Sequence, residues 1–85
     1  MEAPTDTAAI LEELRQAWAR SIDTRNPIAD GDTFTGVGGD SIAATLCVND
    51  VEERFGLAID AEWLLDEATT LGELSERLRA LLSAA

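Results

Sequence analysis

The chain has 85 residues, 46% of them hydrophobic and 5% aromatic, which is enough for one small domain with a thin core. Seventeen acidic residues outnumber six basic ones, and the formal net charge of −11 argues against nucleic-acid binding, because phosphate contacts need a basic surface. Histidine and lysine are absent. Their absence excludes a Ser-His-Asp triad, histidine-based zinc sites and a Walker-type phosphate lysine, so autonomous catalysis is not expected.

No apolar run approaches the ~20 residues that span a bilayer, and residues 1–6 lack the basic and apolar stretches of a secretion signal. The single cysteine, Cys47, permits no intrachain disulfide. We therefore expect a cytoplasmic monomer that is stabilised by packing and binds neither membranes nor a resident metal. Its acidity favours partner proteins with basic docking patches, although charge also simply keeps a small protein soluble.

The first predicted helix covers residues 6–20. Ile10 and Leu14, together with Ala17 or Trp18, recur at helical spacing, while charged and polar side chains fall on the opposite side. We interpret Trp18 as a core residue rather than a platform for a ligand.

Residues 21–40 lack helical periodicity and contain turn signals such as Asn26-Pro27 and three glycines between positions 36 and 39. Structureless loops of about twenty residues are unusual in small domains, and many are functional or disordered. We expect this loop to be held by hydrophobic side chains that reach the core, namely Ile22, Ile28, Phe34 and Val37.

The acidic residues of this loop, Asp30, Asp32 and Asp40, raise the question of a calcium site. The EF-hand spacing of alternate ligands with a closing glutamate is absent. We therefore predict a solvated loop without bound calcium.

The second predicted helix covers residues 41–55 and ends at Gly56, a residue suited to the left-handed conformation after a helix. One stripe of apolar residues is assigned to the core: Ala44, Val48, Val51 and Phe55, with Cys47 beside it. We interpret Cys47 as a small buried apolar residue rather than a reactive thiol.

A second face of this helix carries apolar side chains among polar and acidic ones, which is typical of a docking surface, although single exposed apolar residues are normal in monomers. The residues expected to contact partners are Ile42, Ala43, Leu46, Asn49, Asp50 and Glu53.

Two further helices are predicted. Asp60 caps a short helix over residues 61–66, and Thr70 with Glu73 forms a capping box at the start of a last helix that runs to about Ser83. The short helix carries Trp63, Leu64 and Leu65, and the last helix carries Leu71, Leu74, Leu78 and Leu81 or Leu82. With no alternating strand pattern, the expected fold is all-α: a small four-helix bundle with three longer helices, one short helix and a long first loop.

The junction between the long loop and the second helix has the sequence Gly38-Gly39-Asp40-Ser41. The glycines leave room for an approaching enzyme and permit unusual backbone angles. The helix N-terminus favours a phosphate, and Asp40 is a candidate cap that could also help position a metal or partner. These features suit a serine that tethers a carried group, but the four residues taken alone fit an ordinary helix cap better.

The wider context resembles a known family. Residues 34–42, followed by a helix that ends in VEERFG at residues 51–56, resemble the acyl and peptidyl carrier proteins, and the similarity continues through residues 70–74. It covers the chain from the first helix to the C-terminus. The doubled glycine before Asp40-Ser41 is more similar to peptidyl carriers of nonribosomal synthesis, whereas the high acidity is more similar to free-standing carriers.

This resemblance implies that Ser41 receives 4′-phosphopantetheine from coenzyme A through a phosphopantetheinyl transferase that uses magnesium. The thiol of the arm, not Cys47, would carry an aminoacyl or acyl thioester. Gly38, Gly39 and Asp40 would complete the attachment site, and the exposed helix face would be read by adenylating or ligating loading enzymes and by condensing or tailoring enzymes. The chain departs from common family residues at Thr45, Leu46, Asn49 and Asp50.

The resulting hypothesis is a non-catalytic carrier domain at residues 6–83, with a flexible tail at 1–5 and a short tail at 84–85. It would shuttle intermediates of nonribosomal peptide or polyketide assembly. The alternative is an acidic helical adaptor that binds a basic partner and is never modified. A small serine hydrolase is disfavoured by the missing histidine and lysine.

Overall fold

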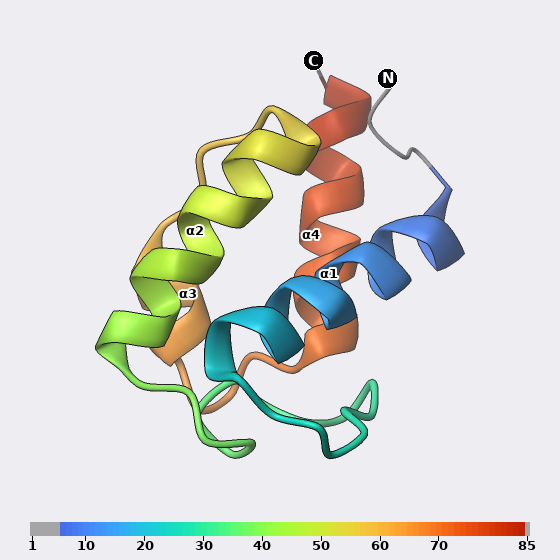
Figure 1. The fold of residues 1–85 in the computed structure, drawn as a ribbon. Helices are drawn as coiled ribbons and strands as arrows, with labels where there is room; N and C mark the ends of the chain where they lie inside the picture. Colours follow the sequence, from blue (N-terminus) through green and yellow to red (C-terminus); the bar gives the residue numbers. More distant parts are fainter. Residues whose placement is uncertain (1–5, 85) are drawn as a thin grey trace.

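The computed structural model describes residues 6–84, which form four helices and no strand. The helices are α1 (Thr7–Ile22), α2 (Ser41–Phe55), α3 (Ala61–Leu65) and α4 (Leu71–Ala84) (Figure 1). The predicted all-α bundle with three longer helices and one short helix is confirmed. The predicted tail at residues 1–5 lies outside the described residues, and position 84, predicted as tail, is the last residue of α4. Within residues 6–84, no helix has the length and apolarity needed to cross a membrane.

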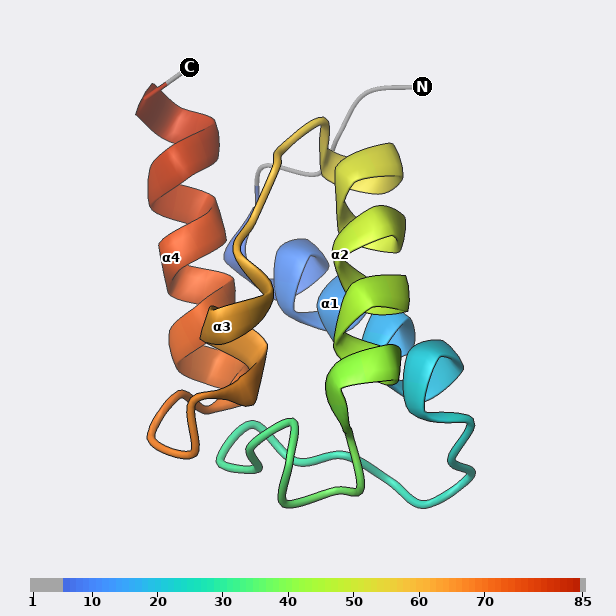
Figure 2. The same cartoon turned by 90° about the vertical axis from the view of Figure 1, so that its left-hand side faces the viewer.

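The longer helices α2 and α4 stand on either side of α1, which contacts both of them, and the short α3 packs against α2 (Figure 2). Their facing sides form one core. Its buried hydrophobic residues are Ile10, Leu14, Ala17, Trp18, Ile28, Phe34, Ala43, Ala44, Cys47, Val51, Phe55, Ile59, Leu64, Leu71, Leu74 and Leu78. Because apolar burial is the main favourable term in folding, this single cluster is what holds the four helices together.

The helical spacing left two choices of core residue open, Ala17 or Trp18 and Leu81 or Leu82, and the structure decides both. Ala17 and Trp18 are both buried, because α1 contacts α2 on one side and α4 on the other. At the end of α4, Leu82 packs against the core while Leu81 is 37% exposed. Val48, predicted as a full member of the core stripe, is only partly buried.

The helix α1 ends two residues later than predicted, at Ile22 rather than Arg20. Ser21, assigned to the loop on sequence, donates its hydroxyl to the Ala17 carbonyl at 2.8 Å and stays helical. Ile22 packs against the core. The helix stops at Asp23, which has a left-handed φ of 58° and donates its N–H to the Ala19 carbonyl.

The other helix ends follow the predicted capping residues closely. Gly56 ends α2 with a left-handed φ of 70°. Asp60 accepts a hydrogen bond from the Glu62 N–H at the start of α3, which ends at Leu65, one residue earlier than predicted. In α4 the Thr70 hydroxyl accepts from the Glu73 N–H at 3.1 Å, so the predicted capping box is confirmed.

The long loop is held at several points along its length. Ile28 and Phe34 are buried, and Ile22 and Val37 are partly buried, as predicted. Backbone hydrogen bonds of 2.9 Å join the loop to the start of α4, from the Leu71 N–H to the Asp32 carbonyl and from the Gly72 N–H to the Asp30 carbonyl. These contacts tie the segment before α2 to the rest of the bundle (Figure 2).

Candidate functional site

Ser41 is the first residue of α2 and its side chain is exposed. Asp40 precedes it as the predicted helix cap: its Oδ1 accepts from the Ala43 N–H at 2.8 Å, and its carbonyl accepts from the Ala44 N–H at 2.8 Å. An aspartate in this position satisfies one of the N–H groups that a helix start leaves without a partner. The cap therefore fixes where α2 begins and holds Ser41 at the surface.

Gly38 and Gly39 contribute to the turn in different ways. Gly38 has a φ of +104°, a backbone angle that residues with a side chain rarely adopt. At Gly39 a Cβ atom would lie 2.3 Å from two ring carbons of Phe34 and 2.7 Å from the Phe34 carbonyl oxygen. The Gly39 N–H also donates to that carbonyl at 2.9 Å. Position 39 must therefore be glycine because any side chain would clash with Phe34 of the same protein. Room for an approaching enzyme, the reason given from the sequence, is a separate requirement.

The Phe34 ring connects this turn to the core. It is fully buried and meets the Trp18 ring edge-on, with ring centroids 5.3 Å apart and planes at 83°. Edge-to-face geometry is favourable for aromatic pairs. Phe34 of the loop therefore contacts Trp18 of α1 on one side and Gly39, just before α2, on the other. These contacts position the start of α2 relative to α1.

The site places backbone donors that suit a phosphate beside the exposed hydroxyl of Ser41. The first-turn N–H groups of Ser41 and Ile42 have no acceptor within the helix, as at every helix start, and the helix dipole favours an anion there. The Asp40 Oδ1 is engaged in the cap, while its Oδ2 accepts no hydrogen bond from residues 6–84. The exposed hydroxyl and these donors fit a phosphodiester on Ser41.

The three loop aspartates do not converge on a metal site. Asp30 pairs with Arg15, Asp32 accepts from the Ala29 N–H, and Asp40 caps α2. Across residues 6–84, no three histidine, cysteine, aspartate or glutamate side chains gather as metal ligands. Each aspartate instead has a separate structural partner.

Most of the predicted docking residues share an exposed face of α2. Ile42 is 72% exposed and Leu46 is 54% exposed, and Asn49 and Glu53 are also exposed. Ala43, which was predicted with them, does not share this exposure: it is 7% exposed and belongs to the core. Ala43 follows Ile42 by about 100° around the helix, which turns it toward α1 and away from solvent.

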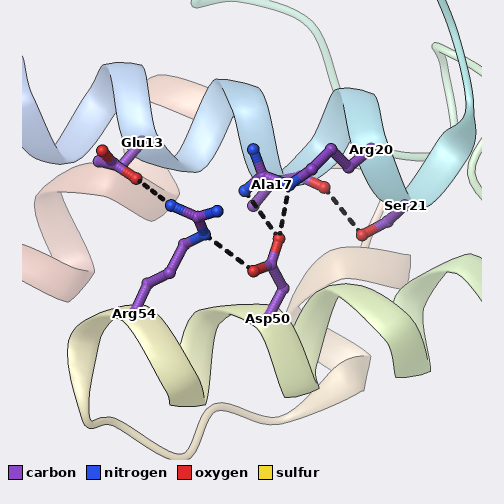
Figure 3. A network of polar contacts seen from close by, with 6 residues as sticks. All are labelled: Glu13, Ala17, Arg20, Ser21, Asp50 and Arg54. Atoms are coloured by element: carbon purple, nitrogen blue, oxygen red, sulfur yellow. Dashed lines mark hydrogen bonds and ion pairs between the residues drawn. The ribbon is translucent and has the colours of Figure 1, made fainter.

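Asp50 differs from the other residues of this face because its carboxylate is already paired. Arg20 of α1 donates to Oδ2 at 2.8 and 3.2 Å, and Arg54 donates to Oδ1 at 2.9 Å. Arg54 also pairs with Glu13 at 3.0 Å (Figure 3). Partial burial disfavours the charged carboxyl, but the hydrogen bonds from both arginines outweigh it and hold the pKa of Asp50 below its ordinary value.

Cys47 lies in the core beneath the exposed face. Burial raises the pKa of its thiol to about 12, because the thiolate would lose its hydration there. The interpretation of Cys47 as a buried, unreactive side chain agrees with this environment.

Sequence reasoning missed two features of the site. The Asp50–Arg54 spacing of four residues was a usable signal for an ion pair, but only the fold brings Arg20 and Glu13 to the same network. The contact between Phe34 and Gly39 was likewise hidden, because nothing in the sequence shows which side chain fills the space left by a glycine.

Comparison with protein families gives one match. The family described as "Phosphopantetheine attachment site" matches residues 12–78 of this chain. The match covers most of α1, the whole long loop with its glycine turn, α2, α3 and the first half of α4. Neither the search of curated proteins nor that of solved structures gave a significant match.

Proposed function

This chain belongs to the phosphopantetheine attachment site family, and we propose that Ser41 is the residue to which its 4′-phosphopantetheine is attached. The protein is accordingly a carrier that holds the covalent 4′-phosphopantetheine group. Domains of this family are in general carriers rather than catalysts. The observation that supports Ser41 is its place within the matched residues: an exposed serine at the capped start of α2.

In the proposed attachment, the Ser41 oxygen bonds to the phosphorus of the phosphopantetheine phosphate of coenzyme A, the pyrophosphate bond of coenzyme A breaks, and adenosine 3′,5′-bisphosphate leaves. A phosphopantetheinyl transferase supplies the magnesium and the base that takes up the hydroxyl proton. The chain contributes position: Asp40 holds the first turn of α2, and the Phe34 ring fixes the preceding glycine. Once bound, the arm supplies a terminal thiol that holds a carried group as a thioester. Cys47 does not compete for that group, because it is buried and its thiol stays protonated.

The carried group is proposed to be an aminoacyl or acyl intermediate of natural-product assembly, with a nonribosomal peptide pathway favoured over a polyketide pathway by the doubled glycine before Asp40. Loading, condensing and tailoring enzymes would approach the exposed face of α2, which carries Ile42 and Leu46 next to Ser41. The net charge of −11 supports partners with basic surfaces, because it attracts them at long range.

The attachment is tested by incubating the purified protein with coenzyme A, magnesium and a broad-specificity transferase, and measuring the intact mass. We expect a gain of one phosphopantetheine in the wild-type chain and none in Ser41→Ala. Ser83→Ala, at an exposed position on α4, serves as the matched control and is expected to be modified normally. Modification of Ser41→Ala would place the arm elsewhere, and an unmodified wild-type chain would favour the adaptor alternative.

A further inference from the structure

The core next to the glycine turn is filled by an aromatic ring. The Phe34 side chain is fully buried, and its Cδ2 and Cε2 atoms would each lie 2.3 Å from a Cβ atom at Gly39. The ring therefore lies directly against the backbone two residues before Ser41. Its centroid lies 5.3 Å from that of Trp18, which is also fully buried. This packing leaves no room for a further group between the ring and the turn.

The side of α2 that faces the core near Ser41 consists of small residues. Ala43 and Ala44 are 7% and 0% exposed. A helix that presents alanines to the core leaves space for a larger group beside it. Within residues 6–84, Trp18 and Phe34 are the two largest fully buried side chains, and they belong to the same hydrophobic cluster as these alanines. The large group near the start of α2 is therefore supplied by the protein itself.

A carried acyl group can enter the core at this point only if Phe34 moves out. Replacing a buried phenylalanine by alanine costs about as much free energy as burying four to six methylene groups gains. Burying the polar thioester with the chain adds a further cost, because its carbonyl loses water. A short acyl chain does not compensate for these losses, so its most stable position is outside the core.

We propose that Phe34 determines where the carried group lies: it closes the core next to Ser41, so that a short acyl or aminoacyl group on the arm stays at the protein surface. In this proposal Phe34 is a specificity-determining residue, because a chain must displace its ring to be buried. The inference rests on the proposed attachment at Ser41, and it adds the size class of the carried group and its exposure to solvent.

Carried groups of different length test this inference in the wild-type chain. A broad-specificity transferase supplied with acetyl-, butanoyl- or hexanoyl-coenzyme A places the acylated arm on the protein, and intact mass confirms the loading. Thermal unfolding should give the same melting temperature for the three forms. Hydroxylamine should cleave the protein-bound hexanoyl thioester as fast as free hexanoyl-pantetheine, because a thioester at the surface is not protected.

Phe34→Ala should reverse this result. It leaves an apolar cavity between Trp18 and Gly39, and apolar cavities in protein cores take up apolar ligands. We expect each added methylene to raise the equilibrium constant for folding about fourfold. The hexanoyl thioester should also be cleaved more slowly than free hexanoyl-pantetheine. Phe34→Leu leaves a smaller space, is expected to disturb folding less, and should show the same dependence on chain length with a smaller slope.

Phe55→Ala is the matched control. Phe55 is 3% exposed, but it is the last residue of α2, fourteen residues after Ser41. Its removal leaves a similar space at the far end of the helix, and we expect no dependence on chain length.

A wild-type melting temperature that rises with chain length would overturn the inference. Folded Phe34→Ala or Phe34→Leu proteins without such a rise would also overturn it. The proposed function stands in both cases, because the intact mass shows that the arm is present. A wild-type chain that takes up no phosphopantetheine overturns both.

Discussion

The two ends of α2 are attached to α1 by different kinds of interaction. At the N-terminal end, Gly39 packs against the buried Phe34 ring, which in turn meets Trp18 of α1. In the C-terminal half, Asp50 and Arg54 of α2 pair with Arg20 and Glu13 of α1 near the surface. The first attachment is apolar and has no free space, whereas the second consists of partly exposed charges.

This difference suggests a division of roles. Close packing tolerates neither added nor removed atoms, so it defines one position for the first turn of α2 and for Ser41. Ion pairs near the surface contribute little to stability, but they decide which charges a partner meets. The packed end would then orient Ser41, the proposed attachment residue, and the charged flank would determine which charges a docking enzyme meets.

The largest expected effect is at the packed end. Gly39→Ala places a Cβ atom 2.3 Å from the Phe34 ring, so we expect the free energy of unfolding to fall by about 1–3 kcal/mol. Phosphopantetheine transfer should slow as well, since the first turn of α2 must move. Thermal unfolding followed by circular dichroism and the transferase rate measure the two effects.

Gly31→Ala is the matched control, because no atom lies within 4 Å of a Cβ at that position. A second variant tests whether the Phe34 ring is the cause. In a Phe34→Leu background, Gly39→Ala should lower the free energy of unfolding by less than it does in the wild type. Part of the clash remains, because the backbone carbonyl oxygen of residue 34 lies 2.7 Å from the added Cβ. If Gly39→Ala and Gly31→Ala were equally stable, the packed end would not be held as described.

A smaller effect is expected at the charged flank. Asp50→Asn should lower the free energy of unfolding by at most about 1 kcal/mol near neutral pH. The fold lowers the pKa of Asp50 below its ordinary value of 3.8, so its contribution is fully present above that pH and is lost as the pH falls through the folded-state pKa. The difference in the free energy of unfolding between wild type and Asp50→Asn should therefore disappear in acid.

Denaturant unfolding of both proteins from about pH 7 down to about pH 3 measures this difference. Glu76→Gln, at an exposed position on α4 that has no ion-pair partner within residues 6–84, makes the same change in net charge. If the difference in the free energy of unfolding between wild type and Asp50→Asn stayed constant across the pH range, the arginines would not stabilise the Asp50 carboxylate.

The smallest expected effect is at Cys47, between the two attachments. Its thiol is buried and its pKa is raised to about 12, so it is protonated at mildly alkaline pH, where an ordinary thiol begins to ionise. We expect no alkylation by iodoacetamide in the native protein at about pH 8 and complete alkylation in denaturant. Rapid native labelling, detected by mass, would mean that the core beneath α2 opens readily.

The helices and their caps were predictable because their signals are local. Asp40, Gly56 and the Thr70–Glu73 pair each act within one turn of the chain, and each lies where its spacing indicated. The burial of Ala43 was not predicted, because it depends on the position of α1 beside α2. The pairing of Asp50 with Arg20, thirty residues away, likewise exists only after folding.

The central claim concerns Ser41, and it is tested most directly by locating the phosphopantetheine group in the modified protein. Cleavage after arginine releases residues 26–54, a peptide in which Ser41 is the only serine. After incubation with coenzyme A and the transferase, we expect fragmentation of this peptide to place the added mass on Ser41. An added mass on any other residue, or on another peptide, would contradict the account.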